Sequence, residues 1–112
     1  MKYLIKGGNR LSGKVRVSGA KNSALKIMAA SIMSKGKTVL RNVPIIDDVL
    51  TMAEVLELLG ASVNLDKALN CIEINPDNIK SFEAPYELVR KMRASILVAG
   101  PLLSRFGEVK VA

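Results

Sequence analysis

An internal repeat limits the folds open to this sequence. When the chain is slid along itself so that Lys21 falls on Met92, KNSALKIMAASIMSKGKTVL aligns with MRASILVAGPLLSRFGEVKV, and Gly36 falls on Gly107. Such self-similarity is typical of folds in which each repeat is one supersecondary unit that buries its apolar face against a neighbour. We therefore expect one complete unit and the start of a second.

The N-terminal part predicts two strands followed by a helix. KYLIKG and KVRVSG alternate apolar and polar residues as strands do, and Leu11, Ser12 and Gly13 between them suit a turn. From Asn22 onward apolar residues recur at helical spacing, and Gly36 follows where a helix C-terminus favours a residue that tolerates positive φ. The apolar positions of this helix are Leu25, Met28, Ala29, Ile32 and Met33.

The middle of the chain predicts a strand, a second helix and a hairpin. TVLRNVP, residues 38–44, has the pattern of a strand that ends at its proline. Asp47 and Asp48 suit the first turn of a helix, where carboxylates are favourable, and Gly60 suits its C-terminus. ASVNLD and CIEINP then predict two paired strands. The apolar face of the second helix consists of Val49, Met52, Val55, Leu56 and Leu59.

The last part of the chain predicts one more helix and strand. A helical pattern follows Pro85 and runs through YELVRKMRASILVAG until Pro101, and EVKVA predicts a short final strand. Together with the repeat, these patterns predict an α+β fold of the α/β repeat type. It would consist of one full βαβαββ unit and the first helix and strand of a second.

The composition favours anionic partners. The 112 residues include 17 Lys and Arg against 10 Asp and Glu, a net charge of +7 that favours phosphates, nucleotides, nucleic acid or anionic surfaces. Proteins that bind single-stranded nucleic acid usually combine basic with aromatic residues, and this chain has two Phe, two Tyr and no Trp. Because histidine is absent and Cys71 is the only cysteine, we expect no metal site and no cofactor.

The chain has the pattern of a globular protein of one domain. No uninterrupted apolar run approaches the roughly 20 residues of a membrane span. The N-terminus MKYLIKGG has neither the apolar core nor the cleavage site of a secretory signal. We therefore expect a cytoplasmic protein without a membrane partner.

Lys21 and Asn22 stand between a glycine-bearing turn and the first helix, and two interpretations remain open for them. Asn22 could cap the helix, since its side-chain oxygen can accept a hydrogen bond from a free backbone N–H, worth about 1 kcal/mol. Alternatively, the free N–H groups and positive dipole end of the helix, together with the Lys21 charge, form an anion site. The residues alone favour the cap.

A second basic group lies in the third helical pattern. Arg90 and Arg93 are three residues apart and project from neighbouring positions of a helix, whereas Lys91 points elsewhere. Most charge runs form a solvated face. Arg93 differs because it flanks the apolar stripe of this helix and can reach from it into a cleft.

Several motifs in order carry a resemblance to a known family. GAKNSAL, RNVP, the helix start with Asp48, APYELVRKMRAS and GPLLSRFG resemble the opening of the UDP-N-acetylglucosamine enolpyruvyltransferases, the carboxyvinyltransferases of peptidoglycan synthesis. The resemblance covers nearly the whole chain. It separates the chain from the related shikimate-pathway synthases, which have a serine in place of Asn22.

The resemblance implies an architecture. The family is an inside-out barrel of βαβαββ units, three to a lobe, with helices inside, sheets outside and ligands between two lobes. Residues 1–21 would belong to the far lobe and residues 22–112 to the near lobe. Lys21 and Asn22 would then lie at the crossing between lobes.

The resemblance also implies substrates and site residues. Lys21 and Asn22 match the pair that contacts phosphoenolpyruvate, and Arg93 matches the arginine that contacts UDP-N-acetylglucosamine and the phosphate region. The reaction transfers an enolpyruvyl group to a sugar hydroxyl by addition and then elimination of phosphate. In the whole enzyme it is the first committed step of peptidoglycan synthesis, and so serves cell-wall biogenesis, cell shape and cell division.

The catalytic cysteine of the family lies on a Pro-Gly-Gly-Cys loop that this sequence does not contain. We therefore expect no catalytic residue in this chain and no transferase activity from it alone, as for an N-terminal fragment of the enzyme. Cys71 does not fill the role, because its place in CIEI indicates a structural residue.

Two other functions remain possible from the sequence, and the sequence also predicts self-association. The +7 charge also fits a small basic α/β module that binds nucleic acid, and a repeat unit could fold and bind nothing. An incomplete second unit would leave apolar surface and the strand edge of EVKVA uncovered, which predicts a homodimer or a larger assembly.

Overall fold

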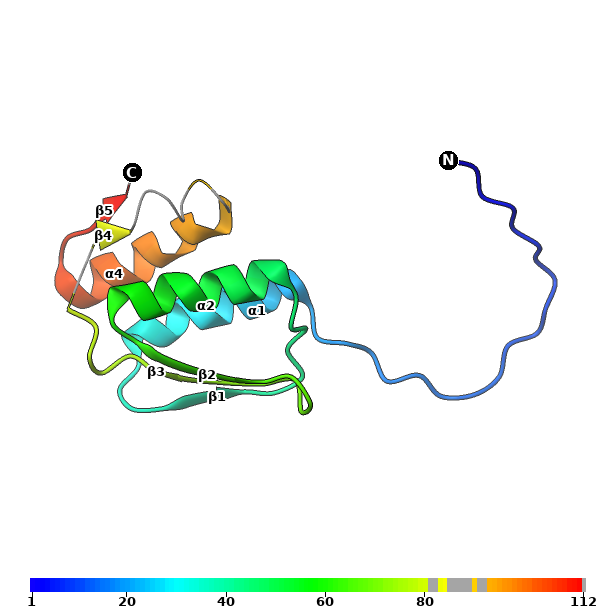
Figure 1. Cartoon of the computed structure of the whole chain (residues 1–112), viewed down its shortest axis with the longest axis horizontal. Coiled ribbons are helices and arrows are strands. Elements are labelled where there is room, and N and C mark those ends of the chain that lie inside the picture. The colour runs from blue at the N-terminus through cyan, green and yellow to red at the C-terminus, as the bar shows by residue number, and fades with distance from the viewer. Residues whose placement is uncertain (81–82, 85–89, 91–92, 112) are drawn as a thin grey trace.

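The computed structural model describes residues 1–80, 83–84, 90 and 93–111, and for residues 83–84, 93–95 and 111 it describes the backbone alone. Two long helices lie side by side over one face of a small sheet, and a third helical segment lies at one end of them (Figure 1). Residues 1–18 extend away from the opposite end, and we call them the N-terminal arm.

The sheet has three antiparallel strands in the order β1-β3-β2. They are β1 (Thr38–Leu40), β2 (Ser62–Asp66) and β3 (Cys71–Asn75). The register places Ile72 of the central strand between Leu40 and Leu65, so these apolar side chains share the face beneath the helices. This alternation fixes the register, since a slip by one residue would turn every apolar side chain to solvent. The predicted hairpin of β2 and β3 is confirmed.

The first helical segment covers one half of this face. It consists of α1 (Lys21–Ala30) and a tighter 3₁₀ turn, η1 (Ser31–Met33). The change coincides with the Ser31 hydroxyl, which donates a 2.6 Å hydrogen bond to the carbonyl oxygen of Met28. Gly36 then adopts a φ of 74°, as the sequence predicts for the end of this segment.

The second helix, α2 (Asp47–Leu59), covers the other half and ends at Gly60, as predicted. Its buried residues include the whole predicted apolar face, and together with α1 and the sheet they form one core. The most deeply buried large side chains are Met28, Ile32, Met52, Leu56, Leu59, Ile72, Ile74 and Leu102.

The second unit begins with a shorter set of elements. These are β4 (Glu83–Ala84), η2 (Arg93–Val98), α4 (Ala99–Phe106) and β5 (Lys110–Val111), and β4 pairs with β5 in parallel. The helix predicted between Pro85 and Pro101 lies partly outside the described residues, and the prediction that Pro101 disturbs it is wrong, because Pro101 lies inside the first turn of α4. Proline is tolerated there, since the first N–H groups of a helix have no intrahelical partner.

Arg105 joins the second unit to the first. One guanidinium nitrogen of this α4 residue donates to the carbonyl oxygens of Ile32 and Pro76, at 3.0 and 2.8 Å. These carbonyls belong to η1 and to the residue that follows β3, so a single side chain connects α4 to both segments of the first unit. The guanidinium also lies 5.2 Å from the centre of the Phe106 ring.

The predicted strands KYLIKG and KVRVSG are not formed. The arm is extended, exposed and without strand pairing, although a bend at Gly13 marks the predicted turn. Tyr3, Ile5 and Val15 remain 80%, 86% and 91% exposed. Alternation predicts a strand only where a partner completes the ladder, and an isolated hairpin is marginally stable in water.

The strand predicted over TVLRNVP is also shorter than expected, since β1 ends at Leu40. Asn42 adopts a φ of 57°, which turns the backbone out of the ladder. The N–H of Val43 then donates to the carbonyl oxygen of Asn70, a residue of the β2–β3 turn with a φ of 48°. The two left-handed asparagines bring these two loops together.

The two units of the repeat share a backbone feature but differ in the burial of an apolar side chain at matching positions. Gly36 and Gly107 both end a helical segment, with φ values of 74° and 79°. Ile32 is fully buried, whereas its counterpart Leu103 is 51% exposed. At this position the second unit therefore presents to solvent an apolar side chain whose counterpart in the first unit is buried in the core.

Substituting Gly60 with alanine tests the turn after α2. Its φ is 115°, and a Cβ would lie 2.7 Å from the carbonyl oxygen of Asn78. We expect Gly60→Ala to lower the free energy of unfolding by about 2 to 4 kcal/mol, from backbone strain together with crowding. The measurement is urea unfolding followed by circular dichroism.

The matched control is Gly36→Ala. Gly36 also has a positive φ, and a Cβ built there meets nothing within 4 Å. The free energy of unfolding of this variant should fall only by the cost of the left-handed backbone conformation, about 1 kcal/mol. Equal losses in the two variants would refute the crowding argument.

Arg105→Met tests the connection between the units. Methionine keeps most of the apolar stem but leaves the carbonyls of Ile32 and Pro76 without their donor. We expect the free energy of unfolding, measured by urea titration, to fall by about 2 kcal/mol, which is typical for the loss of hydrogen bonds from a charged group. Arg10→Met, in the exposed arm, should change nothing measurable. An unaltered midpoint in Arg105→Met would contradict the role of this side chain.

Candidate functional site

Lys21 is the first residue of α1, so the helix starts one position earlier than the pattern from Asn22 predicts. Ala20 is the N-cap in an extended conformation, and its carbonyl oxygen accepts the first helical hydrogen bond, from the N–H of Ala24. Within the described residues no side-chain hydrogen bond caps this helix at Ala20. The interpretation of Asn22 as the cap is therefore wrong. Its side chain lies exposed in the first turn.

The N-terminus of α1 has the electrostatics of an anion site. Its first turn contains no acidic residue, and a cation stands at its first position. A positive charge beside the positive end of a helix is unfavourable by itself, by about 0.3 to 1 kcal/mol. The same arrangement favours a bound anion, which can accept hydrogen bonds from the free N–H groups and pair with the lysine.

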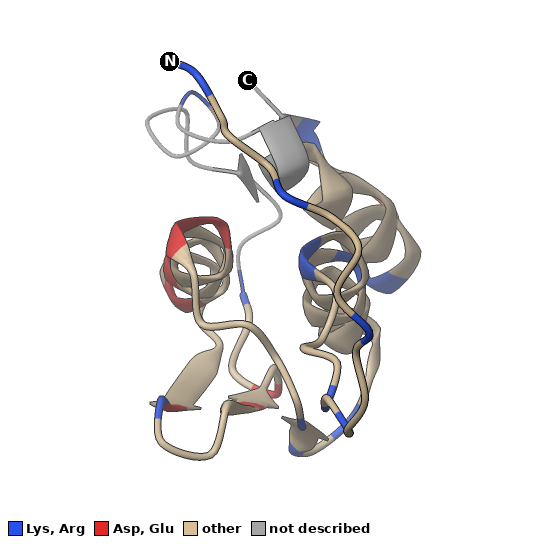
Figure 2. Cartoon of the chain, turned by 90° about the vertical axis from the view of Figure 1, so that its right-hand side faces the viewer, with Lys and Arg blue, Asp and Glu red and all other residues tan. Residues whose placement is uncertain are grey.

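In this structure the charge of Lys21 is paired with a carboxylate from the neighbouring helix. The Lys21 Nζ lies 2.9 Å from Oδ2 of Asp48, in the first turn of α2. The packing of α1 against α2 therefore brings the two helix starts together. Figure 2 shows the contrast, with basic residues on α1 and acidic residues on α2.

The Lys21–Asp48 ion pair at the candidate site was not predicted from the sequence. There Asp48 was assigned only to the start of a helix and to a family motif. The available signal was the opposite charge of residues that begin two successive helices. A contact between helices needs their packing geometry, which the sequence pattern does not give.

Arg93 is placed only in part. Its backbone begins η2, which packs against α1, while its side chain lies outside the part that the structure describes. Lys91 also lies outside the described residues, and Arg90 is exposed. The structure thus brings the helical segment of Arg93 beside that of Lys21 and Asn22, and the convergence of their side chains stays a prediction.

A cavity among the described residues lies next to this site rather than in it. It measures about 710 Å³ and is lined by three segments, residues 16–19 at the base of the arm, residues 41–44 and residues 68–71. Among the described residues that line it, Arg16 and Arg41 are the charged ones. Lys21 and Asn22 are not part of the lining, although Gly19 is.

Cys71 lines this cavity from β3. It is half-buried and makes no disulfide. The structural role expected for Cys71 stays a prediction. Among the described residues there is no group of three or more His, Cys, Asp or Glu side chains that could hold a metal ion. No helix in the described part of the chain is long and apolar enough to cross a membrane.

A double-mutant cycle on Lys21 and Asp48 measures the strength of their pair. Both side chains are nearly half exposed, at 45% and 43%, so the attraction is screened by water. We expect Lys21→Met and Asp48→Asn to show a coupling free energy of about 0.5 kcal/mol in urea unfolding, falling toward zero in high salt.

The cycle on Lys37 and Glu73, an ion pair of 3.4 Å at the sheet surface, is the control. It should give a smaller coupling, because the contact is longer. A coupling above about 2 kcal/mol for Lys21 and Asp48 would mean that the pair is a main stabilising contact rather than a weak surface pair.

Comparison with known proteins agrees with the motifs. The family model of EPSP synthase (3-phosphoshikimate 1-carboxyvinyltransferase) matches residues 5–112. The chain is 48% identical to the UDP-N-acetylglucosamine 1-carboxyvinyltransferase of Saccharophagus degradans and 49% identical to that of Halorhodospira halophila. Each match covers 99% of this chain and 26% of the relative, so the chain spans about a quarter of the relatives' length.

The fold is also shared with a solved structure. The enolpyruvyl transferase NikO from Streptomyces tendae matches 90% of this chain and 23% of its own, with a TM-score of 0.76 and 32% identity. The α+β fold of the enolpyruvyl transferases and the resemblance stated above are thereby confirmed, and the nucleic-acid-binding alternative finds no support. The chain belongs to the EPSP synthase (3-phosphoshikimate 1-carboxyvinyltransferase) family.

Proposed function

We propose that this chain supplies part of the substrate site of a transferase that moves an enolpyruvyl group from phosphoenolpyruvate to UDP-N-acetylglucosamine. The names of the two relatives support this reaction. The observation that carries the proposal is the Lys21 ammonium at the uncapped start of α1. Phosphoenolpyruvate has both a phosphate and a carboxylate, and a helix start with an added cation binds such groups.

The reaction explains why cations are needed. A sugar hydroxyl adds across the enol double bond, forming a C–O bond while the methylene carbon gains a proton. The C–O bond to phosphate then breaks, phosphate leaves with the electron pair, and loss of a proton restores the double bond. Negative charge thus builds up on the departing phosphate, and fixed positive groups stabilise it.

Each site residue has a separate role in this proposal. Lys21 pairs with the phosphate or carboxylate of phosphoenolpyruvate, and the Asn22 amide donates a hydrogen bond to the same ligand. Arg93 pairs with the phosphate region and contacts UDP-N-acetylglucosamine. Protonation of the methylene carbon needs an acid outside these three residues, and the Pro-Gly-Gly-Cys loop is absent from the sequence. We therefore propose that this chain alone does not turn over.

We further propose that residues 1–21 belong to a second lobe and residues 22–112 to the lobe described above. The arm supports this division, since it extends away from the domain and its alternating apolar residues are exposed (Figure 1). The exposed Ile96 and Leu103, at 53% and 51%, support a homodimer or larger assembly of the isolated chain. In the whole enzyme we place the activity in the cytoplasm, in peptidoglycan synthesis that serves cell shape and division.

Titration with phosphoenolpyruvate tests the proposed site. We expect saturable amide NMR shifts at Lys21 and Asn22, and at Arg93 when UDP-N-acetylglucosamine is added. Lys21→Ala should weaken phosphoenolpyruvate binding by about tenfold, or about 1.4 kcal/mol, because it removes the full positive charge that would pair with the ligand. The dissociation constants come from the fitted shifts.

Lys26→Ala is the matched control, because Lys26 is an exposed lysine of the same helix beyond its first turn. It should leave the dissociation constant unchanged. If a folded sample shows no shifts at Lys21 and Asn22, or if Lys21→Ala binds as well as the unmodified chain, the proposal is wrong.

A further inference from the structure

The base of the arm is held against the domain two residues before α1. Asn42 is the centre of this contact, and its side-chain nitrogen donates to the carbonyl oxygen of Val17 at 3.3 Å. Asn42 has a left-handed φ of 57°. The next residue, Val43, is held by a hydrogen bond of 2.9 Å from its N–H to the carbonyl oxygen of Asn70. The contact therefore continues from the β2–β3 turn to the arm.

Gly19 shows how close this approach is. A Cβ on Gly19 would overlap the carbonyl oxygen of Asn42, and it would lie 2.9 Å from the Asn42 carbonyl carbon and 3.3 Å from Cδ of Pro44. No side chain fits at this position without moving the arm or the loop. By contrast, a Cβ on Gly7, Gly8 or Gly13 in the arm itself would meet nothing within 4 Å.

These observations point to one function for both residues. We propose that Asn42 and Gly19 form a joint that fixes the base of the arm on the domain, and that Asn42 is thereby a positioning residue for Lys21. The joint ends at Gly19, and Ala20 and Lys21 follow directly as the N-cap and the first residue of α1. The consequence for ligand binding rests on the proposed function, whereas the joint itself does not.

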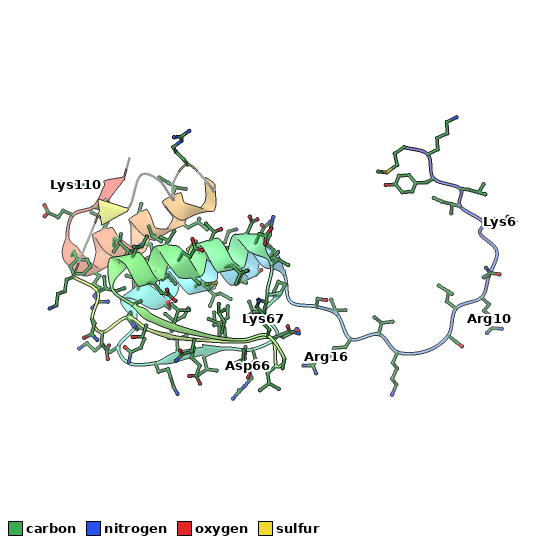
Figure 3. All side chains as sticks on the ribbon, in the orientation of Figure 1. Lys6, Arg10, Arg16, Asp66, Lys67 and Lys110 are labelled. Atoms are coloured by element: carbon green, nitrogen blue, oxygen red, sulfur yellow. The ribbon has the colours of Figure 1, made fainter. Side chains whose placement is uncertain are left out.

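The arrangement of the elements explains why a joint is needed at this place. Figure 3 shows the arm, with Lys6, Arg10 and Arg16, running out from the domain beyond the turn that carries Asp66 and Lys67. Every charged residue of the arm is basic, namely Lys2, Lys6, Arg10, Lys14 and Arg16. Without a fixed base, movement of this long cationic segment would pass directly to the helix start that holds Lys21.

The side chain of Asn42 has two separable properties. Its amide supplies the donor to Val17, and asparagine tolerates the left-handed conformation better than most residues. Asn42→Gly keeps the backbone conformation and removes the donor. Asn42→Asp keeps the size and the tolerance for positive φ, but its carboxylate can only accept, so it opposes the Val17 carbonyl.

Amide relaxation tests the joint directly on the whole chain. In the unmodified protein, we expect the heteronuclear NOE values of Val17, Ser18 and Gly19 to match those of α1, and values for residues 2–12 to be lower. Asn42→Gly and Asn42→Asp should lower the NOE values of Val17 and Ser18 to those of residues 2–12. Gly19→Ala should do the same while the Asn42 side chain is intact.

Asn70→Gly is the matched control. It is the same substitution at another left-handed asparagine, whose contact with Val43 comes from its backbone. Its arm should stay ordered at Val17, and its urea midpoint should equal that of Asn42→Gly. Equal midpoints exclude general loss of structure as the cause of the relaxation change.

A second measurement tests positioning. Asn42→Gly should bind phosphoenolpyruvate about threefold more weakly than Asn70→Gly. The reason is that ordering of the helix start then reduces the net favourable free energy of binding. Equal affinities would overturn the positioning role. Unchanged NOE values at Val17 in both Asn42 variants would overturn the joint. If no variant binds phosphoenolpyruvate while the NOE pattern is as expected, the proposed function fails and the joint stands.

Discussion

The packing of α1 against α2 on the central strand is the constraint on which the rest of the structure depends. Met28, Met52 and Ile72, one from each element, are completely buried. Side chains of this size stabilise a fold by roughly 1.5 to 3 kcal/mol each when fully buried. The attraction between the half-exposed Lys21 and Asp48 is weaker than any one of these. The core therefore determines where the two charges lie, and their attraction adds little to the arrangement.

The sequence predicts the elements whose signals are local. The α2 helix has acidic residues at its start, a continuous apolar face and Gly60 at its end, and each of these signals alone would favour the same limits. The hairpin of β2 and β3 is also predictable, since its alternation allows one register. The arm has an equally clear alternation, but a strand also needs a partner, and alternation carries no information about that partner. The same holds for Asn42, because nothing in RNVP distinguishes a left-handed asparagine from one in an extended strand.

The candidate site could be predicted residue by residue, but not as a geometry. GAKN identifies Lys21 and Asn22, and the repeat aligns Asn22 with Arg93, so both units place a polar residue at the same position near a helix start. The cap was assigned to the wrong residue because the pattern of apolar residues locates a helix only to within a turn. The actual start depends on the extended conformation of Ala20. The pairing with Asp48 and the joint at Gly19 depend on contacts between segments far apart in the sequence.

The charges around Lys21 have a consequence for the kind of ligand that such a site selects. A lysine at the first position of an uncapped helix raises the energy of the empty site, and Asp48 offsets part of this cost. An incoming anion must therefore compete with a carboxylate that is already 2.9 Å from the ammonium. A singly charged anion gains little from this exchange, since it replaces one monovalent partner with another. A ligand with two anionic groups can pair with Lys21 through one and accept hydrogen bonds from the free N–H groups of α1 through the other. Phosphoenolpyruvate, the ligand proposed above, has two such groups, so under that proposal the internal ion pair would favour it over the monovalent anions of the solvent.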